Sequence, residues 1–122
     1  MFKGVVMGLN IQMSVKRNIL LLRLTGELDQ YACKKLKSKV VDVINKYCIK
    51  YLIINFEFLE FMDSTGFGFM IGRYHDLKRN NGKLIICCMN NVIERIVNLS
   101  GLRKICSIVD TEEKAYKILE VA

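Results

Sequence analysis

A short and almost continuous apolar run at residues 51–56 limits this chain to a small set of folds. The run reads Tyr-Leu-Ile-Ile-Asn-Phe and lies between two segments in which apolar residues recur every three or four positions. Such a run is typical of a strand that is buried on both faces of a parallel sheet. Because parallel neighbours are joined by a helical crossover, we expect an α/β domain.

The segments on either side extend this pattern to most of the chain. Residues 9–15 alternate apolar and polar side chains, and residues 19–25 form a second strand-like run after a short polar turn, so the two predict a β-hairpin. Helical patterns and strand-like runs then alternate, at residues 31–47, 51–56, 64–80, 84–89, 91–99, 105–109 and from 110 onward.

The resulting order, ββαβαβαβα, predicts a single α/β domain. We expect a mixed sheet of four to five strands that is covered by about four helices. Residues 7–122 are expected to form this domain, and residues 1–6 an N-terminal extension, for which disorder is one alternative.

The composition fits a globular domain without a membrane span. The chain has 122 residues, of which 52% are hydrophobic, and its longest uninterrupted apolar run covers only residues 84–89. A membrane-spanning helix needs about 20 apolar residues, and the N-terminus lacks the apolar stretch of a signal peptide. We therefore expect a cytoplasmic protein with no membrane contact. The five cysteines lie in apolar patterns and are expected to be reduced core residues.

The formal charge of +7 raises the question of nucleic-acid binding. Residues 31–50 contain six lysines and one aspartate, which gives 6 − 1 = +5 for this segment alone. These lysines lie mostly on the polar side of a predicted helix, with no aromatic side chains between them on which bases could stack. A solvated helix face is therefore favoured over a binding patch, and we expect no direct contact with nucleic acid.

The junction at residues 61–68, Phe-Met-Asp-Ser-Thr-Gly-Phe-Gly, is the first candidate functional site. Here a strand pattern ends and a helical pattern begins, so the hydroxyl of Ser64 is expected to be exposed beside the free N–H groups of a helix start. These N–H groups and the positive end of the helix dipole favour a phosphate group at this position.

The sequence gives little support for an enzymatic function. His75 is the only histidine and has no second residue visibly placed to form a catalytic pair. Ser64 lacks the glycine context of a nucleophile elbow, and the chain contains no phosphate-binding loop of the P-loop type. We expect neither catalysis nor a cofactor or metal.

The helix that begins at Ser64 has two predicted faces. The inward face is expected to carry Phe67, Met70, Ile71, Tyr74 and Leu77, and the opposite face Thr65, Phe69, Gly72, Arg73 and Asp76. Glycines weaken a helix by roughly 1 kcal/mol each relative to alanine, so the glycines at positions 66, 68 and 72 indicate that something approaches closely. Two interpretations remain open: a partner protein that contacts the face of Phe69, or a neighbouring element of the same domain.

Four motifs together resemble a known family. They are residues 26–29 (Gly-Glu-Leu-Asp), the junction 61–68, residues 72–74 (Gly-Arg-Tyr) and residues 100–102 (Ser-Gly-Leu). In this order and spacing they are similar to the anti-sigma-factor antagonists of the STAS superfamily, and most of all to the sporulation type. The resemblance covers the chain from about Met7 onward.

This resemblance implies a function as a binding module. Antagonists of this kind bind, when unphosphorylated, an anti-sigma factor that is also a serine kinase, and so release a sigma factor. The kinase would phosphorylate the residue that corresponds to Ser64, and a PP2C-type phosphatase would reverse the modification. Thr65 stands where relatives have a second serine, so it is the alternative phosphate acceptor.

The resemblance and the helix pattern together give a set of expected partner contacts: Asp29, Asp63, Thr65, Gly66, Phe67, Phe69, Gly72 and Arg73. Asp29 and Asp63 are expected to lie close together, because both follow strands that could be neighbours in the sheet. For Asp29 a purely structural role as a helix N-cap is an equal alternative.

Two other functions compete with this interpretation. One is a STAS scaffold or ligand-binding module that serves another client. The other is a receiver domain that is phosphorylated on aspartate, which the hairpin start and the lack of an acidic pair after the first strands disfavour.

Overall fold

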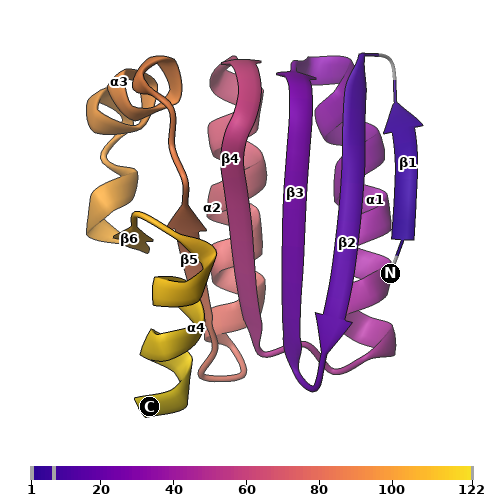
Figure 1. Ribbon diagram of the computed structural model, residues 1–122. Helices are drawn as coiled ribbons and strands as arrows, with labels where there is room; N and C mark the ends of the chain where they lie inside the picture. Colours follow the sequence, from indigo (N-terminus) through magenta and orange to yellow (C-terminus); the bar gives the residue numbers. More distant parts are fainter. Residues whose placement is uncertain (1, 7, 122) are drawn as a thin grey trace.

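The fold is a six-stranded mixed sheet with helices on both faces (Figure 1). It is seen in a computed structural model that describes residues 2–6 and 8–121. The elements are, in chain order, β1 (Phe2–Val6), β2 (Leu9–Lys16), β3 (Ile19–Leu28), α1 (Gln30–Lys46), β4 (Tyr51–Met62), α2 (Ser64–Lys78), β5 (Lys83–Cys87), α3 (Asn91–Ser100), the 3₁₀ turn η1 (Leu102–Lys104), β6 (Ser107–Val109) and α4 (Glu112–Val121).

The strands lie in the sheet in their sequence order. β1, β2 and β3 pair antiparallel, whereas β3, β4, β5 and β6 pair parallel through helical crossovers. The predicted α/β class, the mixed sheet and the order ββαβαβαβα are confirmed for the elements from β2 onward. The run at residues 51–56 forms the middle of β4, which lies between two parallel neighbours as expected.

The N-terminal segment differs from the prediction. Phe2–Val6 forms the edge strand β1, which pairs with residues 9–13 of β2 and adds one strand to the predicted sheet. Five residues are too few for a period of two to stand out, so the sequence pattern could not reveal this strand. The predicted limits of the domain, residues 7 and 122, lie outside the described residues.

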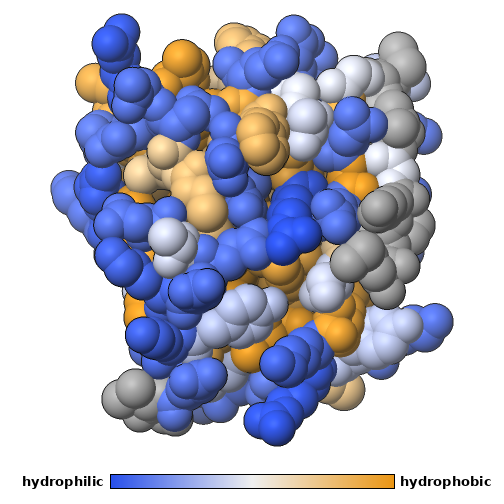
Figure 2. Space-filling model, viewed as in Figure 1, coloured by the Kyte–Doolittle hydropathy of each residue, from blue (hydrophilic) through white to orange (hydrophobic). Residues whose placement is uncertain are grey.

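The core has two unequal parts, one on each face of the sheet. Alternate residues of the central strands point to the side of α1 and α2, among them Leu22, Ile54 and Phe56, and are fully buried. The residues between them, such as Leu21 and Ile53, form a smaller cluster with α4. Figure 1 shows α4 in front of the sheet and α1 and α2 behind it, and Figure 2 shows hydrophobic residues between hydrophilic ones on the front face.

A network of side-chain hydrogen bonds joins α4 to the centre of the sheet. Arg23 of β3 donates to Glu112 through Nε to Oε2 at 2.8 Å and through Nη2 to Oε1 at 2.7 Å. The side-chain amide of Asn55 donates to the same carboxylate at 2.6 Å. The hydrogen bond from Arg23 is the main reason that the pKa of Glu112 lies below its usual value. These bonds explain why a polar Asn interrupts the apolar run of β4.

The cysteines follow the prediction only in part. Cys33 and Cys87 are buried, and Cys88 and Cys106 are half-buried. Cys48 is exposed and lies in a left-handed turn (φ 52°) just after α1. Burial is the main cause that raises the pKa of the Cys33 thiol.

Candidate functional site

The candidate site lies where β3 and β4 end side by side, at the upper edge of the sheet in Figure 1. Leu28 and Met62 pair at the ends of these parallel strands, and the Asp63 N–H donates to the Leu28 carbonyl at 3.4 Å. Asp29 and Asp63 follow directly in their chains. The expectation that these two acidic residues come from neighbouring strand ends is confirmed.

Both aspartates cap the helices that begin here. Asp29 has an extended backbone and accepts a hydrogen bond from the Ala32 N–H at 2.9 Å, so it is the N-cap of α1. Asp63 caps α2 in the same way through the Thr65 N–H. The structural alternative for Asp29 is therefore confirmed, while its contact with a partner stays a prediction.

The Asp63 carboxylate is held in its ionised form. Its hydrogen bond from the Thr65 hydroxyl is the main cause that lowers its pKa, and the backbone N–H groups of Thr65, Gly66 and Gln30 add to this effect. The backbone N–H of Gly66 also donates to the Asp63 carbonyl at 3.0 Å. Asp63 thus accepts hydrogen bonds from two of the backbone N–H groups at the start of α2, those of Thr65 and Gly66.

Ser64 and Thr65 differ sharply in the surroundings of their hydroxyl groups. Ser64 is the first residue of α2, its side chain is exposed, and no hydrogen bond to it is found among the described residues. The Thr65 hydroxyl donates to Asp63 and lies 3.6 Å from the Cys33 sulfur, between α1 and α2. Another molecule can therefore reach the Ser64 hydroxyl without breaking any of the described hydrogen bonds.

Gly66 allows α2 to pack closely against the ends of the strands. It is buried, and a Cβ atom at this position would lie 2.2 Å from Cγ of Met62. Gly68 and Gly72 have open space where a Cβ would be. The two interpretations of the helical glycines therefore apply to different positions. Gly66 contacts an element of the same domain, whereas Gly68 and Gly72 contact none of the elements that the structure describes.

Two residues predicted to face a partner are in the core instead. Phe69 and Arg73 each expose only 5% of their surface. Arg73 donates from Nε to Asp76 at 3.0 Å and lies over the Phe69 ring at 5.3 Å, while its buried Nη1 has no hydrogen-bond partner among the described residues. The prediction of an exposed Phe69 and Arg73 was wrong.

The opposite error concerns Ile71, which was predicted to point inward and is 41% exposed. Apolar side chains occupy positions 67, 69, 70 and 71 of α2, so they surround the helix and their spacing does not decide which side is buried. The close approach at Gly66 sets the orientation, and it turns Phe69 and Arg73 inward. The exposed side of α2 carries Ser64, Gly68, Ile71 and His75, which we call the outer stripe.

Two further exposed apolar residues belong to the same edge of the domain, and neither was among the predicted partner contacts. Tyr31, in the first turn of α1, is 56% exposed, and Phe61, near the end of β4, is 46% exposed. Of the remaining predicted contacts, Phe67 and Gly72 are half-buried. Exposed large aromatic residues beside a charged group are typical anchors of protein interfaces.

Other kinds of site are not found in the part of the chain that the structure describes. It contains no group of three or more side chains that could hold a metal ion. Among the same residues, no helix has both the length and the apolar character needed to cross a bilayer.

Comparison with known proteins places this architecture in a family. Residues 10–115 match the STAS domain. The anti-sigma F factor antagonist of Paenibacillus polymyxa is 34% identical over 115 residues, which cover 94% of this chain and 98% of the relative.

Two solved structures of the antagonist SpoIIAA are also similar. The unphosphorylated form aligns with a TM-score of 0.73 and 29% identity over 90% of this chain and 97% of that one. The phosphorylated form from Bacillus aligns with a TM-score of 0.71 and 32% identity over 89% of this chain and 98% of that one. The chain therefore resembles both states of the same antagonist to nearly the same degree.

Proposed function

This chain belongs to the STAS domain family, and on that basis we propose that it is an anti-sigma factor antagonist controlled by phosphorylation of Ser64. In its unphosphorylated state it binds an anti-sigma factor that is a serine kinase, which frees a sigma factor. The observation that carries the proposal is the exposed hydroxyl of Ser64 at the start of α2, for which the described residues provide no hydrogen-bond partner.

Ser64 is the phosphate acceptor, and Thr65 is not. A kinase must bring the acceptor oxygen into line with the γ-phosphate, which requires an accessible hydroxyl. Reaching Thr65 would break its bond to Asp63 and separate it from Cys33, whereas reaching Ser64 breaks none of the bonds described.

Phosphorylation acts at the surface of the complex and leaves the fold intact. It adds about −1.5 to −2 charge next to the ionised Asp63. The start of α2 offsets part of this charge through its dipole. The nearly equal similarity of this chain to phosphorylated and unphosphorylated SpoIIAA supports a switch without refolding.

The partner contacts the outer stripe of α2 together with the acidic edge beside it. Ile71 supplies an apolar contact, and Gly68 leaves room for a close approach. Asp29, Asp63, Tyr31 and Phe61 extend this surface over the ends of β3 and β4. A phosphate on Ser64 would lie inside this surface and would disrupt it by charge and bulk.

The protein is thus a regulatory binding module and a substrate of other enzymes. STAS anti-sigma factor antagonists are regulatory proteins, and for this chain we propose no catalysis and no cofactor. A PP2C-type phosphatase removes the phosphate. The protein acts in the cytoplasm, without direct contact to nucleic acid or membrane.

Incubation with the cognate kinase and ATP, followed by mass spectrometry, tests the acceptor. We expect one phosphate on Ser64, none in Ser64→Ala and an unchanged level in Thr65→Val. The phosphorylated protein should lose affinity for the kinase and keep the circular dichroism spectrum of the unmodified form. A Ser64→Ala protein that still takes up a phosphate would overturn the assignment.

A further inference from the structure

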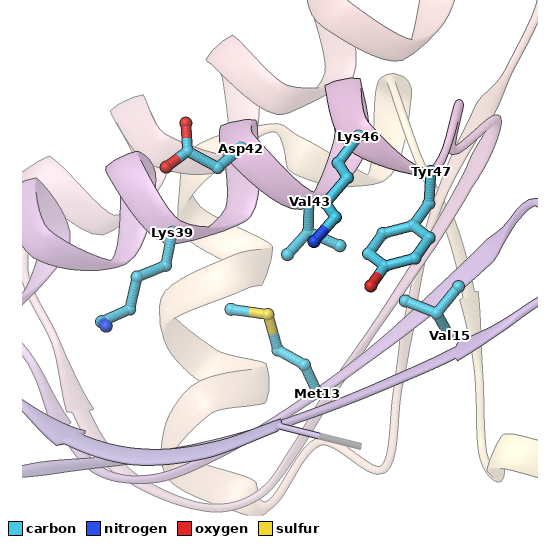
Figure 3. A pocket seen from close by; sticks show the side chains of 7 residues that line it. All are labelled: Met13, Val15, Lys39, Asp42, Val43, Lys46 and Tyr47. Carbon is cyan, nitrogen blue, oxygen red and sulfur yellow. The ribbon is translucent and has the colours of Figure 1, made fainter.

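A groove between α1 and β2 lies at the end of the domain opposite to Ser64. It is lined by Met13 and Val15 of β2 and by five residues from the second half of α1 and its C-cap, namely Lys39, Asp42, Val43, Lys46 and Tyr47 (Figure 3). Tyr47 is 18 residues beyond Asp29, which corresponds to about 27 Å along a helix. The groove is therefore separate from the proposed kinase surface.

Four of the seven lining residues are apolar or aromatic and form the inner part of the groove. Val15 and Val43 are partly buried against the core and Tyr47 is 48% exposed, so these three residues supply the accessible apolar surface, and Met13, only 2% exposed, lies beneath it. Figure 3 shows Met13 and Val15 on the strand facing Val43 and Tyr47 on the helix. The volume of about 530 Å³ lies within the range of small-molecule sites, about 300–1,000 Å³.

The charged residues at the rim give the groove a positive side. Lys46 and Asp42 are four residues apart on α1, a spacing that permits an ion pair, but no such pair occurs among the described residues. The Lys46 ammonium instead lies 5.5 Å from the centre of the Tyr47 ring. In Figure 3 it extends over the groove while the Asp42 carboxylate points away from it, and Lys39 lies at the other end of the groove.

The surrounding charge favours the same kind of ligand. Residues 31–50 carry +5 of the formal charge of +7 of the whole chain, so most of the net positive charge lies on α1 and the segment that follows it. A positive potential of this kind attracts anions from solution. An apolar floor and lysines at its rim together match a molecule with an apolar chain and one negative end.

We propose that this groove binds an amphipathic carboxylate, a free single-chain fatty acid. Its chain lies on Val15, Val43 and the Tyr47 side chain, above the buried Met13, and its carboxylate lies between Lys39 and Lys46. Long lysine side chains suit this role, because their apolar stems cover the chain while their ammonium groups meet the charge. This inference does not depend on the phosphorylation switch.

The test is a titration of the unphosphorylated protein with decanoate, kept below the concentration at which it forms micelles and followed by calorimetry. We expect saturable binding of one decanoate per chain. 1-Decanol, which has the same chain without the charge, and sulfate, which has charge without a chain, should each bind at least about tenfold more weakly. ¹⁵N NMR should place the shifted amide signals at the residues that line the groove.

Variants distinguish binding in the groove from nonspecific attraction of an anion to the positively charged helix α1. The double variant Lys39→Gln/Lys46→Gln should lower the affinity at least about tenfold, and Val43→Glu should block binding, because it fills part of the groove and repels the carboxylate. Lys34→Gln/Lys37→Gln removes the same charge from exposed positions of α1 outside the groove and should bind as the wild type does. Circular dichroism confirms the fold of each variant.

Four outcomes would overturn the proposal. They are no saturable binding of decanoate, equal binding of 1-decanol, equal losses in both lysine double variants, and amide shifts located away from the groove. Binding to vesicles of anionic phospholipid without binding of free decanoate would also overturn it, since the surface would then recognise a membrane.

Discussion

Asp63 accepts two hydrogen bonds on the same carboxylate oxygen from Thr65, one from its backbone N–H at 2.9 Å and one from its hydroxyl. The first bond caps α2, and the second ties the Thr65 side chain to the cap. This arrangement separates the two adjacent hydroxyl groups of the motif, because it occupies Thr65 and leaves Ser64 exposed.

Thr65→Val removes the hydroxyl bond and keeps the size of the side chain. We expect a loss of about 1 kcal/mol in the free energy of unfolding at pH 7, the ordinary value of one hydrogen bond. Phosphorylation of Ser64 should continue. Urea denaturation measures the first effect and mass spectrometry the second.

The same variant should change the response to acid. The pKa of Asp63 is lower in the folded state than in the unfolded chain, so its stabilising contribution is present above about pH 4 and disappears as pH falls through the folded-state value. Removing the hydroxyl raises the folded-state pKa and should flatten this dependence. An identical acid profile in both proteins would contradict the role of the hydroxyl.

Gly66→Ala and Gly68→Ala should have opposite effects on stability. A Cβ at Gly66 would overlap Met62, and overpacking of this kind costs about 1–3 kcal/mol. A Cβ at Gly68 meets nothing, so the higher helix propensity of alanine should add up to about 1 kcal/mol. Thermal unfolding compares the two variants.

Gly68→Ala also tests the outer stripe. If the kinase approaches α2 closely there, the more stable variant should bind it more weakly. Unchanged affinity in Gly68→Ala would remove Gly68 from the proposed surface.

Periodicity predicted most of the fold because strand-like and helical patterns alternate clearly from residue 9 onward. It did not reveal β1, which is short, nor the network around Asn55, whose partner Glu112 lies 57 residues away. Such a pairing depends on which elements become neighbours, and a local pattern contains no information about it.

The position of Ser64 was predictable for a different reason. The change from strand to helix is a local event, and Asp-Ser-Thr-Gly marks the helix start through its capping residue. The orientation of α2 could not be predicted in this way, because local sequence does not determine it. It depends on the fit of Gly66 against Met62, so the periodicity of α2 predicted the wrong side for Phe69 and Arg73.

Glu112→Gln should loosen α4. The variant loses the ion pair with Arg23 and keeps a group that can still accept from Asn55. Because the Arg23 side chain is 42% exposed, we expect a modest loss of about 1–2 kcal/mol. Urea denaturation at pH 7 measures it, and Glu113→Gln is the matched control, because Glu113 is exposed and forms no ion pair with Arg23 in the part of the chain that the structure describes.

The difference between these two variants should depend on pH. Arg23 lowers the pKa of Glu112 in the folded state, so the stabilisation is present above about pH 4.5 and is lost in more acidic solution. A stability difference that stays constant down to pH 3 would show that Glu112 acts through packing alone.

Ile71 and Phe69 allow the partner surface and the core to be separated by experiment. Ile71→Ala changes a side chain that is 41% exposed, so we expect less than about 1 kcal/mol loss of stability and at least about tenfold weaker binding of the unphosphorylated protein to the kinase. Phe69→Ala removes a buried ring and should cost about 3–5 kcal/mol in stability.

The affinity of each folded variant can be measured by surface plasmon resonance at a temperature where circular dichroism shows it to be native. Val92→Ala, which changes an exposed apolar residue of α3 outside the proposed surface, serves as the control and should bind normally. If Ile71→Ala bound like the wild type while Phe69→Ala lost affinity without losing stability, Phe69 would be a direct contact after all. The proposed orientation of α2 toward the kinase would then be wrong.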